Sequence, residues 1–104
     1  MDLDGLGRFA DPAVLILSSL AGGPKHGYGL IKDVEEFAGV ALGPGTLYGA
    51  LGRLEERGLI EALAPQDRRR PYRITAAGAV ALRGYLNHAA GVARLGLRRL
   101  QAHP

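Results

Sequence analysis

Residues 43–58 constrain the fold more than any other segment, because they predict a short amphipathic helix with both ends marked. Pro44 falls at the first helical position, where its missing N–H costs nothing. Gly58 supplies the left-handed residue that commonly ends a helix. One face of this helix is apolar at helical spacing and must pack against a core; it consists of Leu47, Ala50, Leu51 and Leu54.

The opposite face of this helix is almost bare, because Gly45, Gly49 and Gly52 align along it. Each interior glycine weakens a helix by roughly 1 kcal/mol relative to alanine. A surface kept this smooth indicates that a bulky object lies against it, and a DNA groove about 12 Å wide is one candidate. Loose selection on a surface that touches nothing is the alternative.

The chain length and composition favour one small intracellular domain. At 104 residues, self-association would add stability. The chain has no cysteine, so we expect no disulfide, no cysteine-based metal site and a cytoplasmic location. No apolar run approaches the ~20 residues of a membrane span, and the start does not read as a signal peptide.

Charge is divided unevenly along the chain. Residues 1–63 carry five Lys/Arg against nine Asp/Glu, a net charge of −4. Residues 64–104 carry eight arginines against a single Asp, a net charge of +7. Such asymmetry points to an anionic partner, with nucleic acid as the first candidate and a membrane surface as the second.

Two helices are predicted before residue 43. The first starts at Asp11 as N-cap and Pro12 as first helical residue, and glycines 22–23 stop it. The second opens at residues 25–29 and ends at Gly39. Its predicted core face comprises Leu30, Ile31, Val34 and Phe37. Residues 1–10 are predicted to be an N-terminal arm, either helical or frayed.

Residues 59–63 and 72–75 predict two strands joined by a polar turn. The turn lies between two prolines, which suit a two-stranded ribbon because both of its strands are edges. The result is a β-hairpin with a basic tip, formed by Arg68, Arg69 and Arg70.

Thr75 predicts the N-cap of a last helix that runs to about Gln101. We expect this helix to fray after Gly96, because glycine is a poor helix former. Its apolar face exceeds what one small domain can cover, which predicts a homodimer contact with the same helix of a second chain. The stripe consists of Leu82, Tyr85, Leu86, Ala89, Val92, Ala93, Leu97 and Leu100.

Three helices, a basic hairpin and a long helix follow one another in the order of a winged helix-turn-helix. The predicted fold class is mainly α with a small β-hairpin. We predict a DNA-binding domain over residues 1–75 and a dimerisation helix over residues 76–104, within the same compact unit. In this architecture the third helix enters the major groove, and the hairpin, or wing, contacts the backbone or the minor groove.

Three motifs resemble the PadR-type transcriptional regulators. Residues 24–28, Pro-Lys-His-Gly-Tyr, are similar to the opening of that family's second helix. Residues 43–60 resemble its recognition helix, and residues 70–78 resemble its wing and the start of its last helix. The resemblance covers about residues 12–86.

The resemblance implies a homodimeric repressor whose symmetry favours a palindromic operator, with a small-molecule effector as a further candidate partner. It places DNA contacts at Lys25, His26, Tyr28, Thr46, Tyr48, Arg68, Arg69 and Arg70. Arg53 is either a further DNA contact or the ion-pair partner of Glu56. Gly49 departs from the family, which usually has proline there. Since the chain has no tryptophan, Phe9 and Tyr85 are the aromatic candidates for a ligand pocket.

Catalysis, metal binding and cofactors are not expected. Ser18 and Ser19 lie inside an apolar helix without the sharp turn that exposes a nucleophile. No phosphate-binding glycine loop is present. The three histidines, His26, His88 and His103, lack metal-ligand spacing.

Two alternatives to DNA binding stay open. One is a winged-helix interaction scaffold, in which the basic wing meets an acidic protein. The other is a peripheral membrane binder that uses Arg94, Arg98 and Arg99, although these residues also suit the negative end of a helix dipole.

Overall fold

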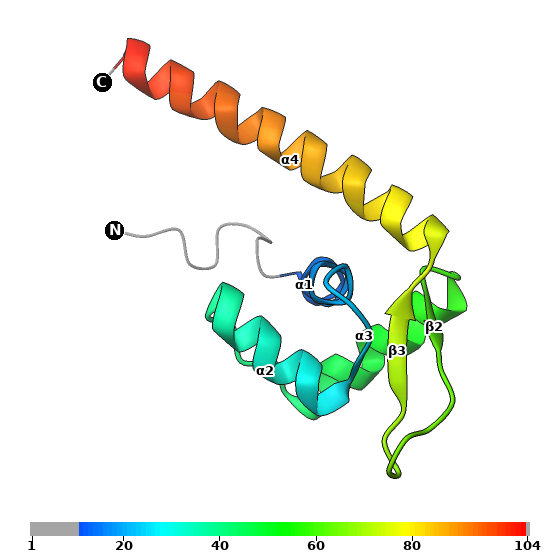
Figure 1. Cartoon of the computed structure of the whole chain (residues 1–104). Helices are drawn as coiled ribbons and strands as arrows, with labels where there is room; N and C mark the ends of the chain where they lie inside the picture. Colours follow the sequence, from blue (N-terminus) through cyan, green and yellow to red (C-terminus); the bar gives the residue numbers. More distant parts are fainter. Residues whose placement is uncertain (1–10, 104) are drawn as a thin grey trace.

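The computed structural model describes residues 11–103, within which a small antiparallel sheet packs beside four helices (Figure 1). The elements are α1 (Pro12–Leu20), β1 (Lys25–His26), α2 (Gly27–Ala38), α3 (Pro44–Glu56), β2 (Ile60–Ala62), β3 (Pro71–Ile74) and α4 (Ala76–Ala102). The N-terminal arm predicted over residues 1–10 lies outside the described residues. Within them, the order confirms the predicted fold class.

Most helix ends form where the sequence predicts them, and the start of α2 is the exception. The Asp11 carboxylate accepts a hydrogen bond from the Ala13 N–H at 2.9 Å, and the Thr75 hydroxyl accepts one from the Gly78 N–H at 3.0 Å. Both satisfy backbone donors that a helix start leaves free. Gly39 ends α2 with a φ of 67°, and Gly58 follows the end of α3 with a φ of 72°.

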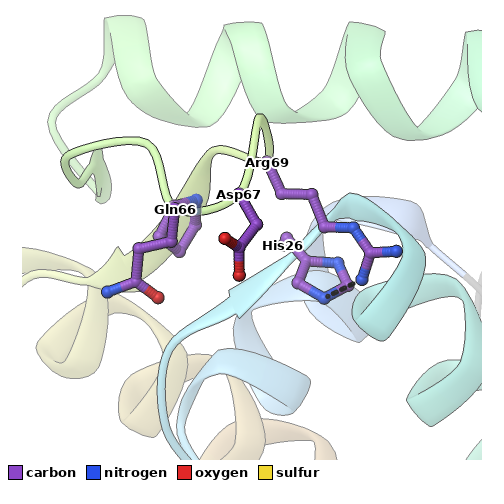
Figure 2. Close-up of a pocket in the computed structure, with 5 residues that line it drawn as sticks. His26, Gln66, Asp67 and Arg69 are labelled. Atoms are coloured by element: carbon purple, nitrogen blue, oxygen red, sulfur yellow. Dashed lines mark hydrogen bonds between the residues drawn. The ribbon is translucent and has the colours of Figure 1, made fainter.

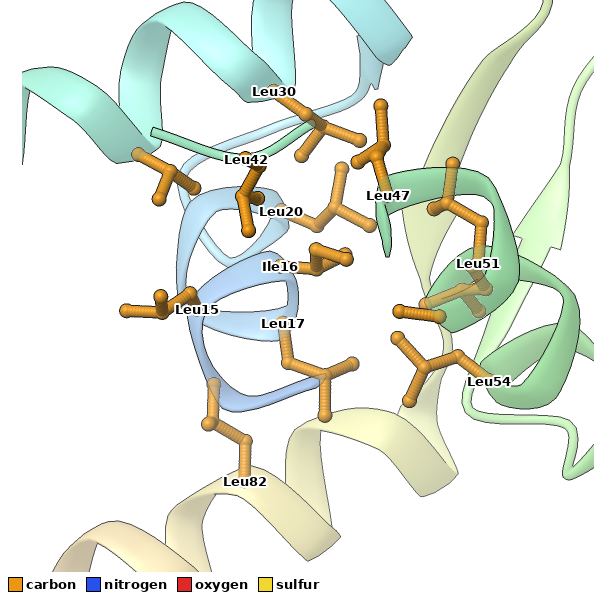
Figure 3. Packing of buried hydrophobic residues seen from close by; sticks show 13 residues of the cluster. Leu15, Ile16, Leu17, Leu20, Leu30, Leu42, Leu47, Leu51, Leu54 and Leu82 are labelled. Atoms are coloured by element: carbon orange, nitrogen blue, oxygen red, sulfur yellow. The ribbon is translucent and has the colours of Figure 1, made fainter. Parts of the chain in front are cut away.

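The core forms around α1, which packs against α2, α3 and the first turns of α4. Figure 3 shows its leucines and Ile16 meeting side chains from the other helices. The largest fully buried side chains are Ile16, Leu20, Leu30, Val34, Leu47, Leu51 and Ile60. The predicted leucine face of α3 therefore packs into this core.

One predicted core residue, Phe37, is 51% exposed. Residues 35–39 are all exposed, so the last turn of α2 extends beyond the helices that cover Leu30 and Val34. Ile31 is only partly buried against the core. The prediction was wrong at Phe37 because helical spacing identifies a face but not where its neighbours end.

The sheet has a third strand that was not predicted. The strand order is β1-β3-β2, with β3 antiparallel to both neighbours. Lys25 and His26, assigned from the sequence to the start of a helix, pair instead with Tyr72 and Pro71 of β3. The predicted hairpin is confirmed as β2 and β3, and β1 ties it to the start of α2.

The wing ends in a tight turn that contains no glycine. Gln66 and Arg69 exchange backbone hydrogen bonds of 2.7 and 2.8 Å, and the two residues between them have positive φ, 50° at Asp67 and 66° at Arg68. This is the pattern of a type I′ turn, which normally favours Asn-Gly. The left-handed conformation costs an ordinary residue about 1 kcal/mol, and it places Arg68 at the tip.

Helix α4 continues to Ala102 without a break at Gly96, so the predicted fraying is not seen. Strong helix formers flank Gly96, and a single glycine costs only about 1 kcal/mol. Only Gly78 and Leu82 of this helix are buried, and its C-terminal half projects from the body (Figure 1). No helix in the described part of the chain is long and apolar enough to cross a membrane.

Candidate nucleic-acid interface

The start of α2 is fixed to the wing by His26. Its backbone pairs with β3, while its Nδ1 accepts a hydrogen bond of 3.2 Å from the Gly29 N–H. The imidazole therefore caps α2, which agrees with its position at a helix start. This double role holds the first turn of α2 beside the wing.

The other ring nitrogen of His26 faces the wing tip, where Nε2 lies 3.2 Å from a guanidinium nitrogen of Arg69 (Figure 2). A neutral imidazole has one acceptor nitrogen, and arginine can only donate. When Nδ1 caps α2, Nε2 carries the hydrogen and cannot accept from Arg69. The Arg69 guanidinium carries five N–H donors and forms no ion pair among the described residues, which leaves donors available to an anion.

Three elements converge on one concave surface, which we call the tyrosine–arginine cleft. The start of α2, the helix α3 and the wing enclose a cavity of about 330 Å³. It is lined by His26, Gly27, Tyr28, Tyr48, Arg68, Arg69, Arg70 and Tyr72. Six residues predicted to contact DNA therefore meet at one place, although they come from three sequence segments that are spread over more than 40 residues.

The cleft offers neutral hydroxyls beside uncompensated positive charge. Tyr28 and Tyr48 are 65% and 57% exposed, which is unusual for large aromatic side chains. Burial, reinforced by the Glu55 carboxylate, raises the pKa of Tyr72 above its ordinary value of 10.0, against the opposing effect of Arg70. The ion pairs of the described residues, Lys25–Asp33 and Arg73–Glu61, leave the wing-tip arginines out.

Apart from α3 itself, nothing among residues 11–103 packs against the three glycines of the bare face of this helix. A Cβ added at Gly45 or Gly52 would meet nothing within 4 Å, and one at Gly49 would meet only the Arg53 guanidinium at 3.5 Å. Packing within the protomer therefore does not require these glycines. Thr46 and Arg53 lie exposed on α3. In the described part of the chain Arg53 forms no ion pair with Glu56, so that alternative is not realised.

Lys25 departs from its predicted role, because its ammonium is turned toward the protein. Its Nζ donates a 2.5 Å hydrogen bond to the Ser19 carbonyl and lies 3.8 Å from the Asp33 carboxylate. The buried Ser19 hydroxyl in turn donates to Asp33 at 2.6 Å. The Lys25 ammonium is thus held by a carbonyl at the end of α1 and by a carboxylate on α2. Through these contacts Lys25 connects both helices to β1.

The predicted dimerisation stripe is exposed on α4, with one exception. Tyr85, Leu86, Val92, Leu97 and Leu100 are exposed, and Ala89 is partly exposed. Leu82 is instead buried in the core of its own chain, and Figure 3 shows it pointing from α4 toward α1. Assigning it to the dimer contact was wrong, because the first turns of α4 already close the body. Of the two candidates for a ligand pocket, Phe9 lies outside the described residues.

Sequence reasoning missed Gly27 and Tyr72 as parts of the cleft. Tyr72 had a signal, since it follows the basic turn, but only the strand pairing places it beside α2 and α3. Gly27 had a signal only as a member of the motif at residues 24–28, which does not place it against α3. Among residues 11–103, no three His, Cys, Asp or Glu side chains gather to hold a metal ion.

A three-helix body, a wing beside the second and third helices and a long final helix define a winged helix-turn-helix DNA-binding fold. The model of the transcriptional regulator PadR-like family matches residues 16–84, which is more than half of the chain. The chain therefore belongs to the PadR-like family of transcriptional regulators.

Solved structures support this placement. A PadR family transcription regulator from Clostridium difficile R20291 superposes with a TM-score of 0.77 at 26% identity, covering 86% of this chain and 97% of the other. One from Eggerthella lenta gives 0.72 at 29% identity, covering 93% and 87%. An uncharacterized 37.1 kDa protein in transposon TN4556 of Streptomyces fradiae is 46% identical over 71 residues. That match covers 68% of this chain, which spans about a fifth of the relative's length, 21%.

Proposed function

We propose that this transcriptional regulator binds a palindromic DNA operator as a homodimer and represses the adjacent promoter. The observation that carries the proposal is the tyrosine–arginine cleft. It brings the helix start of α2, an exposed tyrosine of α3 and three wing arginines to one concave surface. Hydroxyls and guanidinium groups are the donors that proteins commonly direct at DNA phosphates.

In the proposed complex, α3 lies in the major groove with its glycine face against the DNA. The absence of side chains at Gly45, Gly49 and Gly52 lets the backbone approach closely. Thr46, Tyr48 and Arg53 then supply the contacts from this helix. The wing reaches the phosphates on one side, with Arg68 foremost at the turn.

The homodimer part of the proposal is supported by α4. This helix leaves Leu86, Val92, Leu97 and Leu100 exposed on one face, where a second copy would cover them. A two-fold axis through paired α4 helices would present the two α3 helices to half-sites about one helical turn apart. An effector that changed the pairing of the α4 helices would alter the distance between the two α3 helices. We infer that this change would release the protein from the operator.

The test begins with selection of duplexes from a random library, followed by titration of the enriched duplex at several salt concentrations. The affinity should fall with a slope of about −0.9 in log K per phosphate neutralised. The triple variant R68A/R69A/R70A should flatten this slope by about 1 for each lost phosphate contact. The matched control is R94A/R98A/R99A, which removes the same charge from the far end of α4 and should keep the slope.

Three outcomes separate the candidate functions. Enrichment of a palindrome with a wing-dependent slope supports the proposal. Binding that is equally weakened by both triple variants would mean that net charge alone attracts DNA. If no duplex is enriched, the DNA-binding proposal fails, and the interaction scaffold with an acidic protein partner becomes the better account of the basic wing.

A further inference from the structure

Gly27, the first residue of α2, lies directly beneath the side chain of Tyr48. A Cβ at Gly27 would lie 2.5 Å from the Tyr48 hydroxyl oxygen and 3.1 Å from its Cζ. The Cδ2 of Leu47, which is fully buried, would be 3.4 Å away. The Tyr48 side chain therefore packs against the start of α2, and its hydroxyl group lies too close to leave room for a Cβ at residue 27.

The backbone does not explain why this residue is glycine. The positive-φ glycines of the described chain are Gly23, Gly39 and Gly58, so Gly27 has a conformation that any residue adopts. The first position of a helix also accepts most residues. The remaining reason for glycine at residue 27 is the space that the Tyr48 side chain occupies. This is a tertiary contact, because Gly27 lies on α2 and Tyr48 on α3.

We propose that Gly27 is a positioning residue for DNA binding, because it lets the Tyr48 ring lie against α2 with its hydroxyl in the tyrosine–arginine cleft. This inference rests on the function proposed above. A methyl group at residue 27 would push the hydroxyl outward. Tyr48 is 57% exposed, so its ring has solvent-filled space to move into, and the change would displace the tyrosine rather than unfold the protein.

The experiment compares Gly27→Ala with Gly29→Ala, two residues further along α2. A Cβ at Gly29 would come no closer than 3.6 Å to Lys25, an ordinary contact, so Gly29→Ala changes helix propensity without touching Tyr48. On the enriched duplex, we expect Gly27→Ala to weaken binding by roughly three- to tenfold, the net contribution of one hydrogen bond. Gly29→Ala should bind like the unmodified protein.

The salt dependence tests whether the effect is one of position. Tyr48 is neutral, so Gly27→Ala should lower the affinity while leaving the slope of log K against log salt unchanged. If the substitution instead displaced the wing, arginine contacts would be lost and the slope would flatten. A flattened slope would therefore overturn the proposal.

A double-mutant cycle with Tyr48→Phe tests whether Gly27 acts through the tyrosine. Tyr48→Phe removes the hydroxyl that meets the added Cβ, so the losses from Gly27→Ala and Tyr48→Phe should not add. Additive losses would overturn the proposal. So would the absence, in the unmodified protein, of NMR cross-peaks between the Gly27 Hα protons and the Tyr48 ring.

Failure of this inference and failure of the proposed function give different results. If the unmodified protein enriches no duplex, both fail. If it binds with a wing-dependent slope while Gly27→Ala binds equally well, the function stands and the positioning role is overturned.

Discussion

The winged-helix body and helix α4 use their apolar residues in opposite ways. From α1 to β3, leucine, isoleucine and valine side chains point inward, and Ile16, Leu30, Val34 and Leu47 have no exposed surface. Along α4, Leu82 is buried, whereas Leu97 and Leu100 are 63% and 67% exposed. Within the described residues, the body therefore buries its large aliphatic side chains, whereas α4 leaves most of its own exposed.

The body and α4 are therefore expected to draw their stability from different contacts. Burying a leucine side chain stabilises a protein by about 1.5–3 kcal/mol. Covering the exposed stripe of α4 would therefore add several kcal/mol of stability that the single chain lacks. The helix also contains Gly84, Gly91 and Gly96, which weaken it further. We infer that stability of the body is independent of protein concentration, whereas order along the far half of α4 depends on it.

The largest effect is expected from a cavity at the centre of the body. Ile16→Ala removes a side chain with no exposed surface from the helix around which the others pack, and should lower the free energy of unfolding by about 4 kcal/mol. Urea unfolding at two protein concentrations measures this loss. A loss below about 1 kcal/mol would show that the body depends on α4 pairing rather than on its own core.

The junction between the two regions should be almost as sensitive. A Cβ at Gly78 would overlap the Leu59 carbonyl oxygen, which is backbone and cannot rotate away, and would lie 2.8 Å from Ile74 Cγ1. Gly78→Ala should therefore destabilise the protein by about 3 kcal/mol, as overpacking does. Gly84→Ala is the control, since its Cβ would meet nothing within 4 Å. Equal thermal unfolding of the two variants would contradict this account of the junction.

A charge introduced on the exposed stripe of α4 should affect self-association without affecting the fold of the body. Leu97→Asp should weaken the proposed dimer by about 2 kcal/mol per protomer and leave the body folded. Light scattering should then shift from twice 11.0 kDa toward a single chain at concentrations where the unmodified protein is dimeric. Val80→Asp is matched in exposure, 66% against 63%, but lies on the opposite side of α4. It should leave the mass unchanged; a shift with both variants would contradict pairing along the stripe.

The sequence predicted well what local chemistry determines. Helix ends followed from Asp11, Thr75 and Gly39, and the apolar face of α3 followed from leucine spacing, because capping and periodicity act within a few residues. Strand β1 could not be predicted, since two residues show no alternation and the strand exists only through its pairing with β3.

The candidate site was predictable by residue type but not by arrangement. The tyrosines and wing arginines were identified from composition and resemblance, yet the inward turn of Lys25 depends on Asp33 and on the end of α1. Contact between Gly27 and Tyr48 joins two helices across the fold. The direction of such side chains depends on tertiary packing, so it could not be predicted from the sequence one residue at a time.

The smallest effect is expected at the wing tip, where the body carries local strain. Arg68 has a φ of 66°, a conformation that glycine adopts without cost, so Arg68→Gly should raise the free energy of unfolding by roughly 0.5–1 kcal/mol. The same change removes a charge and should flatten the salt dependence of DNA binding by about 1. Arg68→Ala should flatten it equally without the gain in stability. If instead Arg68→Ala stabilised the protein as much as Arg68→Gly, backbone strain at the turn would not be the cause, and repulsion among the wing arginines would explain the gain.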